Sequence, residues 1–251
     1  MNKSKCIVVA SLAVLSTLAV TSGHAEEKAA TAAEAPRPSE QKIAESLKKL
    51  IFVPHDVGAP EVTDAGGVRA ISVLPKIELL APQQVARALS PTPTLYWHVS
   101  KAVEGPVRFT LLVDNPTAST PLLEAEVDGI DQEGIYSISL EDHGLALENG
   151  KRYIWSIALS ADNNNYSSAP VAQTMMEHET APGLTKTLDG ALPETRAVRF
   201  AAEGYWYDAV DTLSDQIGRS LDKSWQAARA RLLSQAGLPH AARFDLQRAG
   251  E

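Results

Sequence analysis

Apolar and polar residues alternate with a period of two through the middle of the chain. Leu95, Trp97 and Val99, for example, alternate with Tyr96 and His98. Further short, β-prone apolar runs cover residues 71–80, 107–113, 122–127, 134–140, 152–160 and 166–176. Turn-forming sequence separates several of them. About seven short strands at this spacing predict an antiparallel β-sandwich over residues 70–178.

On the N-terminal side of this region the period becomes helical. Ile43, Leu47, Leu50 and Ile51 are spaced to share one face of a helix, and Ser39 is a suitable N-cap. This spacing predicts an amphipathic helix over residues 39–51, which either docks on the main body or binds a partner. Residues 52–69 follow it as a glycine-rich loop segment.

The C-terminal region, residues 190–251, is also helical in period and contains a repeat. Gly204, Ala209 and Leu213 recur 33 residues later, at positions 237, 242 and 246. A helix, a glycine-marked turn and a second helix resemble a tetratricopeptide-type unit, and arrays of these need about three units for stability. We therefore expect the hairpins to bury one face against the sandwich in an α+β fold. The alternative is an alanine-rich helical bundle with a coincidental repeat.

The first 25 residues have the layout of a secretory signal. Lys3 and Lys5 precede an apolar run over residues 6–20, and small residues follow before a cleavage site expected between Ala25 and Glu26. The run is shorter than the 20 or so residues that span a bilayer. Residues 26–38 have the composition of a disordered tether. We expect an exported chain, periplasmic or extracellular, with no membrane span after signal removal.

Composition narrows the possible chemistry of the exported chain. The single cysteine, Cys6, leaves with the signal, so the remainder has no disulfide, thiolate metal site or cysteine nucleophile. The formal net charge is −8, and loss of Lys3 and Lys5 makes it −10. An acidic chain repels phosphate backbones, which disfavours a nucleic-acid partner.

One segment gives the sandwich a more specific resemblance. Residues 147–152 lead into a strand in which Tyr153, Trp155, Ile157 and Leu159 occupy alternate positions. This segment resembles the tyrosine corner of immunoglobulin-like and fibronectin type III domains, in which a tyrosine bonds back to the preceding turn. The resemblance implies that Trp97 is the core tryptophan of an earlier strand.

The order of several segments carries a second resemblance. The segments cover residues 58–69, 93–97, 134–138, 147–155, 206–213 and 225–238. The series resembles the bacterial family catalogued as domain of unknown function 928, over roughly residues 52–240. The resemblance implies an exported envelope protein and no particular mechanism. Ala65 stands where members usually have a third glycine, and residues 160–162 lack a cysteine that relatives often have, so a function of that thiol would be absent.

Candidate catalytic motifs are incomplete. Two Ser-x-x-Lys matches lack their companion motifs, and the histidines do not have metal-ligand spacing. We therefore predict no catalytic residues, no metal and no cofactor. Arg69, beside two glycines, could bind a carboxylate; the alternative is a structural loop with Arg69 in an internal salt bridge.

The consecutive aromatic residues Tyr205, Trp206 and Tyr207 are the main binding candidates. Three adjacent side chains cannot share one helix face, and exposed rings suit protein hot spots or stacking on sugars. The alternative is that they fill the junction between helices and sandwich. The leading hypothesis is a non-enzymatic envelope interaction module that binds another envelope protein.

Two other functions stay open. The first is carbohydrate or cell-wall binding through Tyr205, Trp206 or Tyr96. The second is an unrecognised hydrolase, which requires a serine, a histidine and an acid to converge in the fold. Ser137 or Ser156 close to His143 would support the hydrolase.

Overall fold

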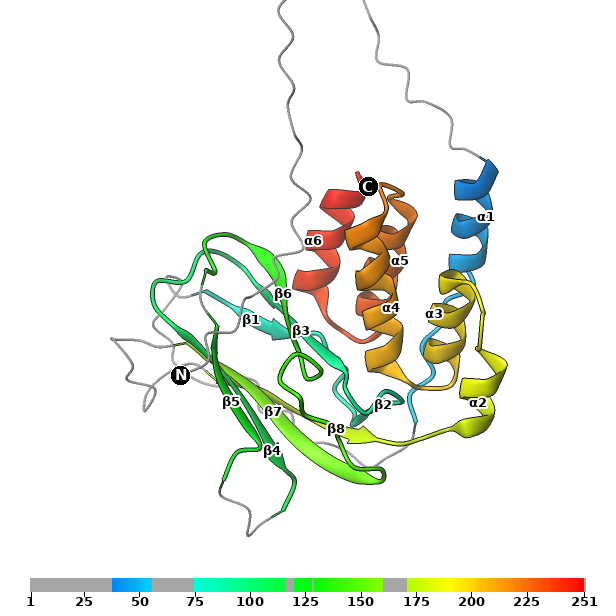
Figure 1. Cartoon of the computed structure of the whole chain (residues 1–251). Helices are drawn as coiled ribbons and strands as arrows, with labels where there is room; N and C mark the ends of the chain where they lie inside the picture. Colours follow the sequence, from blue (N-terminus) through cyan, green and yellow to red (C-terminus); the bar gives the residue numbers. More distant parts are fainter. Residues whose placement is uncertain (1–37, 56–74, 116–119, 128, 160–170, 251) are drawn as a thin grey trace, which may run out of the picture.

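The computed structural model describes residues 38–55, 75–115, 120–127, 129–159 and 171–250. It is an α+β structure in which two β-sheets lie on one side and a group of helices on the other (Figure 1). The predicted signal with Ala25 and Glu26, the tether up to residue 37, and Arg69 lie outside the described residues. None of the described helices is long and apolar enough to cross a membrane.

Eight strands form the two sheets of a sandwich-like body. The three-stranded sheet has the order β1-β3-β6 and is antiparallel, with β1 (Ile77–Leu79), β3 (Thr94–Val99) and β6 (Gly134–Ser139). The five-stranded sheet has the order β2-β8-β7-β4-β5, with β2 (Ala86–Ala88), β4 (Val107–Val113), β5 (Leu123–Val127), β7 (Lys151–Leu159) and β8 (Val171–His178). Only the β2–β8 pair is parallel.

The period-two pattern buries one face of each long strand. Tyr153, Trp155 and Ile157 on β7 are buried, and Trp97 on β3 is buried in the same core. The predicted strands are confirmed where the structure describes them, although β1 occupies only the end of residues 71–80. The prediction missed β2, because three residues are too few to show an alternation.

The tyrosine bond expected at the start of β7 is present. The backbone N–H of Glu148 donates to the Tyr153 hydroxyl at 2.8 Å. This contact ties the turn before β7 to the strand itself. The backbone N–H of Leu147 also donates to the carbonyl of Pro91 at 2.7 Å. This bond joins the turn before β7 to the segment that leads into β3.

Six helices complete the described structure. They are α1 (Pro38–Leu47), α2 (Pro182–Thr187), α3 (Pro193–Ala202), α4 (Trp206–Arg219), α5 (Ser224–Gln235) and α6 (Pro239–Ala249). α3 with α4, and α5 with α6, form two hairpins, and α4 also packs against α5. α4 contacts β2 and β3, so the first hairpin joins the helices to both sheets.

The 33-residue sequence repeat is also a repeat of structure. Gly204 and Gly237 both have left-handed backbone angles, with φ of 79° and 75°. After each glycine the next N–H donates five residues back: Tyr205 to Phe200 at 2.8 Å, and Leu238 to Leu233 at 3.0 Å. Glycine adopts this φ without the steric cost that a Cβ brings, which explains why it marks both turns.

The N-terminal helix docks on the main body, but its predicted bounds are wrong. α1 begins at Pro38, so Ser39 lies in the first turn, and it ends at Leu47. Ile51 was predicted on the buried face and is 60% exposed. Because the helix has already ended, the helical period no longer sets the direction of this side chain. α1 packs against α3 and α5.

Candidate functional site

The aromatic cluster lies in the junction between α4 and the sheets, which we call the seam. Tyr205, Trp206 and Tyr207 are 4%, 0% and 2% exposed. The three rings do point in different directions, as the sequence predicted. Each direction is occupied by another part of the protein, so none of the rings reaches solvent, and the alternative of a filled junction is the one the structure supports.

Trp206 and Tyr207 each contact a different sheet. The indole N–H of Trp206 donates to the carbonyl of Leu80, which follows β1, at 2.7 Å. The indole N–H of Trp155 on β7 donates to the Tyr207 hydroxyl at 3.0 Å. Burial raises the pKa of the Tyr207 hydroxyl far above its ordinary value. Both rings therefore hold α4 against the sandwich, and the Tyr207 hydroxyl stays protonated.

Tyr205 lies beneath the guanidinium of Arg87, whose central carbon is 4.7 Å from the ring centroid. Arg87 on β2 is itself buried, and it donates to Glu179 at 2.6 Å and to the carbonyl of Glu203 at 2.5 Å. This arrangement joins β2, the end of α3 and the residue after β8. The guanidinium over the ring adds a cation–π attraction.

Two carboxylates on α4 complete the seam. Asp208 accepts from the backbone N–H groups of Leu89 and Ser90, at 2.6 and 2.9 Å. Burial raises the pKa of Asp208 to about 6, against the opposing effect of these two hydrogen bonds. The Tyr96 hydroxyl on β3 donates to Asp211 at 2.7 Å. Burial, followed by the charge of Asp211, raises the pKa of Tyr96 strongly.

A buried ion pair lies within the second hairpin, and a hydrogen bond from it reaches the first. Arg229 on α5 donates from Nε and Nη2 to both oxygens of Asp245 on α6, at 2.7 and 2.8 Å, and from Nη1 to Ser214 on α4 at 2.8 Å. Burial alone would lower the pKa of Arg229, but the charge and hydrogen bonds of Asp245 outweigh it and raise the pKa. The pair keeps three helices in register.

The seam therefore excludes one version of the carbohydrate hypothesis. Tyr96, Tyr205 and Trp206 are all buried and bonded within the protein. A sugar could stack on them only after the helices separated from the sheets. The idea that these rings form an exposed sugar platform is wrong.

The N-terminal segment, for which the sequence left docking or partner binding open, docks on the helices. We call residues 38–55, which comprise α1 and the segment after it, the N-terminal strap. The side chain of Arg231 donates to the carbonyl of Leu47 at 3.1 Å. Gln235 donates to the carbonyl of Leu50 at 3.3 Å and accepts from the N–H of Phe52 at 2.8 Å. In the sequence, Arg231 and Gln235 are four residues apart, which places both side chains on the same face of a helix.

After α1, alternate side chains of the strap turn inward, Leu50 buried and Phe52 half-buried. Leu50 is 4% exposed and Phe52 meets the edge of Trp206 with ring centroids 4.8 Å apart. Ile51 and Val53, between and after them, point to solvent. The N–H of Val53 donates to the carbonyl of Ala201 at 3.1 Å. The strap is thus a helix followed by a short extended stretch that runs over the other helices.

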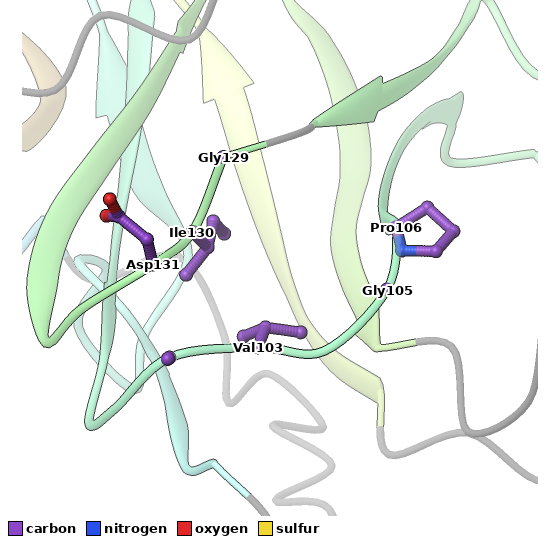
Figure 2. A pocket seen from close by; sticks show the side chains of 7 residues that line it. Val103, Gly105, Pro106, Gly129, Ile130 and Asp131 are labelled. Atoms are coloured by element: carbon purple, nitrogen blue, oxygen red, sulfur yellow. The ribbon is translucent and has the colours of Figure 1, made fainter.

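An open hollow of about 510 Å³ lies at the ends of the sheets, away from the seam. It is lined by Ala102, Val103, Gly105, Pro106, Gly129, Ile130 and Asp131. Figure 2 shows Val103, Ile130 and Pro106 around the hollow, with Asp131 at one side. Asp131 is its only charged lining residue, which gives little basis for chemistry. Among the described residues no three His, Cys, Asp or Glu side chains converge as a metal site.

A comparison with known protein families identifies the family of this chain. The family described as Domain of Unknown Function (DUF928) matches residues 65–246. The chain belongs to this family. The DUF928 match covers the sandwich and both helical hairpins, including Gly204, Arg231 and Gln235, and it begins after the N-terminal strap. The resemblance to domain of unknown function 928 that the sequence showed is confirmed.

Comparisons beyond DUF928 add no functional argument. No curated protein matches the chain. One similar solved structure is Astrotactin-2, described as a conserved vertebrate-specific and perforin-like membrane protein involved in neuronal development. It has 11% sequence identity and a TM-score of 0.29, and the match covers 70% of this chain. This DUF928 chain spans 36% of the length of that chain.

Proposed function

We propose that this protein is a non-enzymatic interaction module of the bacterial envelope that presents a helical surface to another envelope protein. The observation that carries the proposal is the seam. Its aromatic and acidic side chains hold α4 to backbone groups of the sheets, at Leu80, Leu89 and Ser90. Groups of this kind form the reactive centre of many enzymes. Here they fix the position of the helices, which leaves the outer helical faces for recognition.

Finer architectural assignments support a binding role. The tyrosine bond between Glu148 and Tyr153, and the antiparallel pairing of all described strands except β2 with β8, favour a fibronectin type III-like sandwich. The equivalent turns at Gly204 and Gly237 favour tetratricopeptide-like hairpins. Both architectures commonly present binding surfaces, although a fold by itself does not establish a function.

Site-specific photocrosslinking in intact cells tests the interaction. Arg199 on α3 and Ser234 on α5 are exposed helical positions, and Glu126 on β5 is an exposed control on the far sheet edge. A photoreactive residue at the helical positions is expected to give a discrete adduct, and at Glu126 none. An adduct from Glu126 alone, or from none of the three, contradicts the proposal.

The extracytoplasmic location rests on the N-terminal sequence. Lys3, Lys5 and the apolar run that follows support export, and the cysteine-free remainder needs no disulfide catalyst. Fractionation followed by intact-mass measurement is expected to find a chain that begins at Glu26 outside the cytoplasm. A chain that keeps residues 1–25 and stays in the cytoplasmic fraction contradicts this part of the proposal.

A further inference from the structure

The N-terminal strap is held in the way that proteins hold a bound peptide. Arg231, Gln235 and the carbonyl of Ala201 make hydrogen bonds only to its backbone. Backbone hydrogen bonds of this kind give affinity for an extended peptide whatever its side chains are, and pockets for alternate side chains supply specificity. The strap shows both features.

The apolar contacts define what the side chains must be. Leu47, at the end of α1, is fully buried, and Leu50 and Phe52 are the next inward positions. Ile51 and Val53 face away from the helices. The preferred ligand is therefore a helix that ends in a large aliphatic residue, followed by an extended stretch with apolar residues at alternate positions.

The first hairpin turn lies against the strap and the second does not. A Cβ at Gly204 would lie 3.0 Å from the carbonyl oxygen of Val53, whereas a Cβ at Gly237 would meet nothing within 4 Å. The two turns have the same backbone conformation. The backbone of the strap thus approaches one of two equivalent turns so closely that a side chain there would push it back, and the guanidinium of Arg87 lies at the same 3.0 Å.

We propose that the α3–α5 face, formed by Ala201, Gly204, Arg231 and Gln235, is a peptide-binding face for a partner segment of this chemistry. In the isolated chain the strap occupies the face, and the partner segment binds by displacing it. This inference rests on the proposed interaction function and specifies its site. The strap lies outside the DUF928 match, while all four residues of the face lie within it.

The covalent attachment of the strap makes binding conditional. Nineteen residues lie between residue 55 and residue 75, which is the next residue that the structure describes. A segment tethered in this way competes as if it were present at about millimolar concentration. A partner must therefore bind well below that concentration, or be presented at high local density, before it displaces the strap. Weak, unrelated peptides are excluded.

Fluorescence anisotropy with a labelled synthetic peptide of residues 38–55 tests the face in the full chain. In one variant, Leu47→Asp with Phe52→Asp removes the two anchors and releases the strap. The peptide is expected to bind this variant at least tenfold more tightly than it binds the wild-type chain. Adding Arg231→Ala and Gln235→Ala to the released variant is expected to weaken binding at least tenfold.

A matched control uses the other Arg and Gln pair at the same helical spacing. Arg243 and Gln247 are exposed on α6, so Arg243→Ala with Gln247→Ala in the released variant is expected to leave peptide affinity unchanged. Equal losses from the two pairs would overturn the proposal. A labelled peptide that carries the same two aspartate substitutions is expected not to bind.

A second form of the protein guards against misfolding of the released variant. A specific protease sequence is placed between residues 55 and 75 of the wild-type chain, and the chain is cut after folding. The labelled peptide is expected to exchange into the cut protein and not into the uncut one. No exchange in the cut protein overturns the proposal even if the cellular crosslinks are found, in which case the interaction function stands without this face.

A further measurement distinguishes a separate partner from a second copy of this chain. Light scattering across a concentration series is expected to show a monomer for the uncut chain. A dimer that disappears in the Leu47→Asp, Phe52→Asp variant would show that the face takes the strap of a second copy, and it would overturn the proposal of a separate partner.

Discussion

The two helical hairpins share one design and differ in how they attach to the sheets. Their turns superimpose in conformation, with Gly204 and Gly237 at the same place in the 33-residue repeat. The equivalent positions 208 and 241 both dock on the sandwich with the roles reversed. Asp208 accepts from backbone N–H groups, whereas the N–H of Ala241 donates to Glu78 at 2.6 Å. The repeat sets the hairpin, and single residues set the docking.

The first helical residue after each turn shows the same contrast. Trp206 is fully buried in the first hairpin, and its counterpart Pro239 is exposed in the second. Proline suits the start of a helix because its missing N–H has no partner there. The first hairpin is thus built into the body of the protein, and the second packs on it.

The largest expected effect compares these two positions. Trp206→Ala removes a buried ring and leaves the carbonyl of Leu80 without its donor, which should lower the free energy of unfolding by about 4–6 kcal/mol. Pro239→Ala should change it by about 0.5 kcal/mol or less. Urea unfolding followed by circular dichroism measures both. Similar losses at the two positions would mean that the hairpins are attached alike.

The ion pair gives the second contrast. Asp245→Ala leaves the guanidinium of Arg229 buried without a counter-charge and should cost about 3–5 kcal/mol of stability. Thr212, the equivalent position in the first hairpin, bonds only to the carbonyl of Asp208 within its own helix. Thr212→Ala should cost about 0.5 kcal/mol or less. A chemical denaturation series in which Asp245→Ala is as mild as Thr212→Ala would refute the structural role of the pair.

The third contrast concerns pH, since Asp208 has no titratable counterpart at position 241. The folded pKa of Asp208 is raised to about 6 from an ordinary 3.8, so between these values the folded state binds more protons than the unfolded state. The contribution of Asp208 to the free energy of unfolding should therefore fall as pH rises from about 4 to about 6, by about 1–3 kcal/mol. Asp208→Asn should remove that fall. An unchanged profile of unfolding free energy against pH in this variant would contradict the assignment.

The smallest effect isolates the strap. Gly204→Ala and Gly237→Ala both place a Cβ on left-handed backbone, which should cost about 1–2 kcal/mol at either turn. Only the Cβ at position 204 also meets neighbouring groups, the backbone of the strap at Val53 and the guanidinium of Arg87, so Gly204→Ala should cost about 1 kcal/mol more. Thermal unfolding of the two variants gives the difference. Equal losses would indicate that the strap does not lie against the first turn.

The sequence predicted the parts of the fold that depend on periodic or local signals. The alternation around Tyr153 and Trp155 identified β7 and its buried face, because the period of a strand is set by its own geometry. The bond from Glu148 to Tyr153 spans five residues and was also predictable. The glycine repeat identified both hairpin turns for the same reason.

The parts that depend on distant partners could not be predicted in this way. The burial of Tyr205, Trp206 and Tyr207 depends on Arg87, Phe52 and Trp155, which come from separate parts of the chain. Helix geometry predicted three directions for the rings, but it gave no information on what fills each direction. The seam was therefore one of two open alternatives.

Two residues of the α3–α5 face were not predicted for a related reason. In the sequence Arg231 and Gln235 resemble ordinary exposed helix residues, because their partners are backbone atoms 184 and 185 residues earlier in the chain. Residues 50–53 are all apolar, so the sequence does not show which of them face the helices, and the helical spacing from Ile43 to Ile51 placed Ile51 on the wrong side. The ion pair of Arg229 and Asp245 had no sequence signal beyond opposite charge.

Native-state hydrogen exchange tests most directly whether the seam makes the helices and the sandwich one cooperative unit. Amides in the middle of α4 and of β7 are expected to exchange with the same free energy of opening, and Trp206→Ala should lower both together. Amides of α4 that open at a much lower free energy than those of β7, with β7 unaffected by Trp206→Ala, would contradict the account.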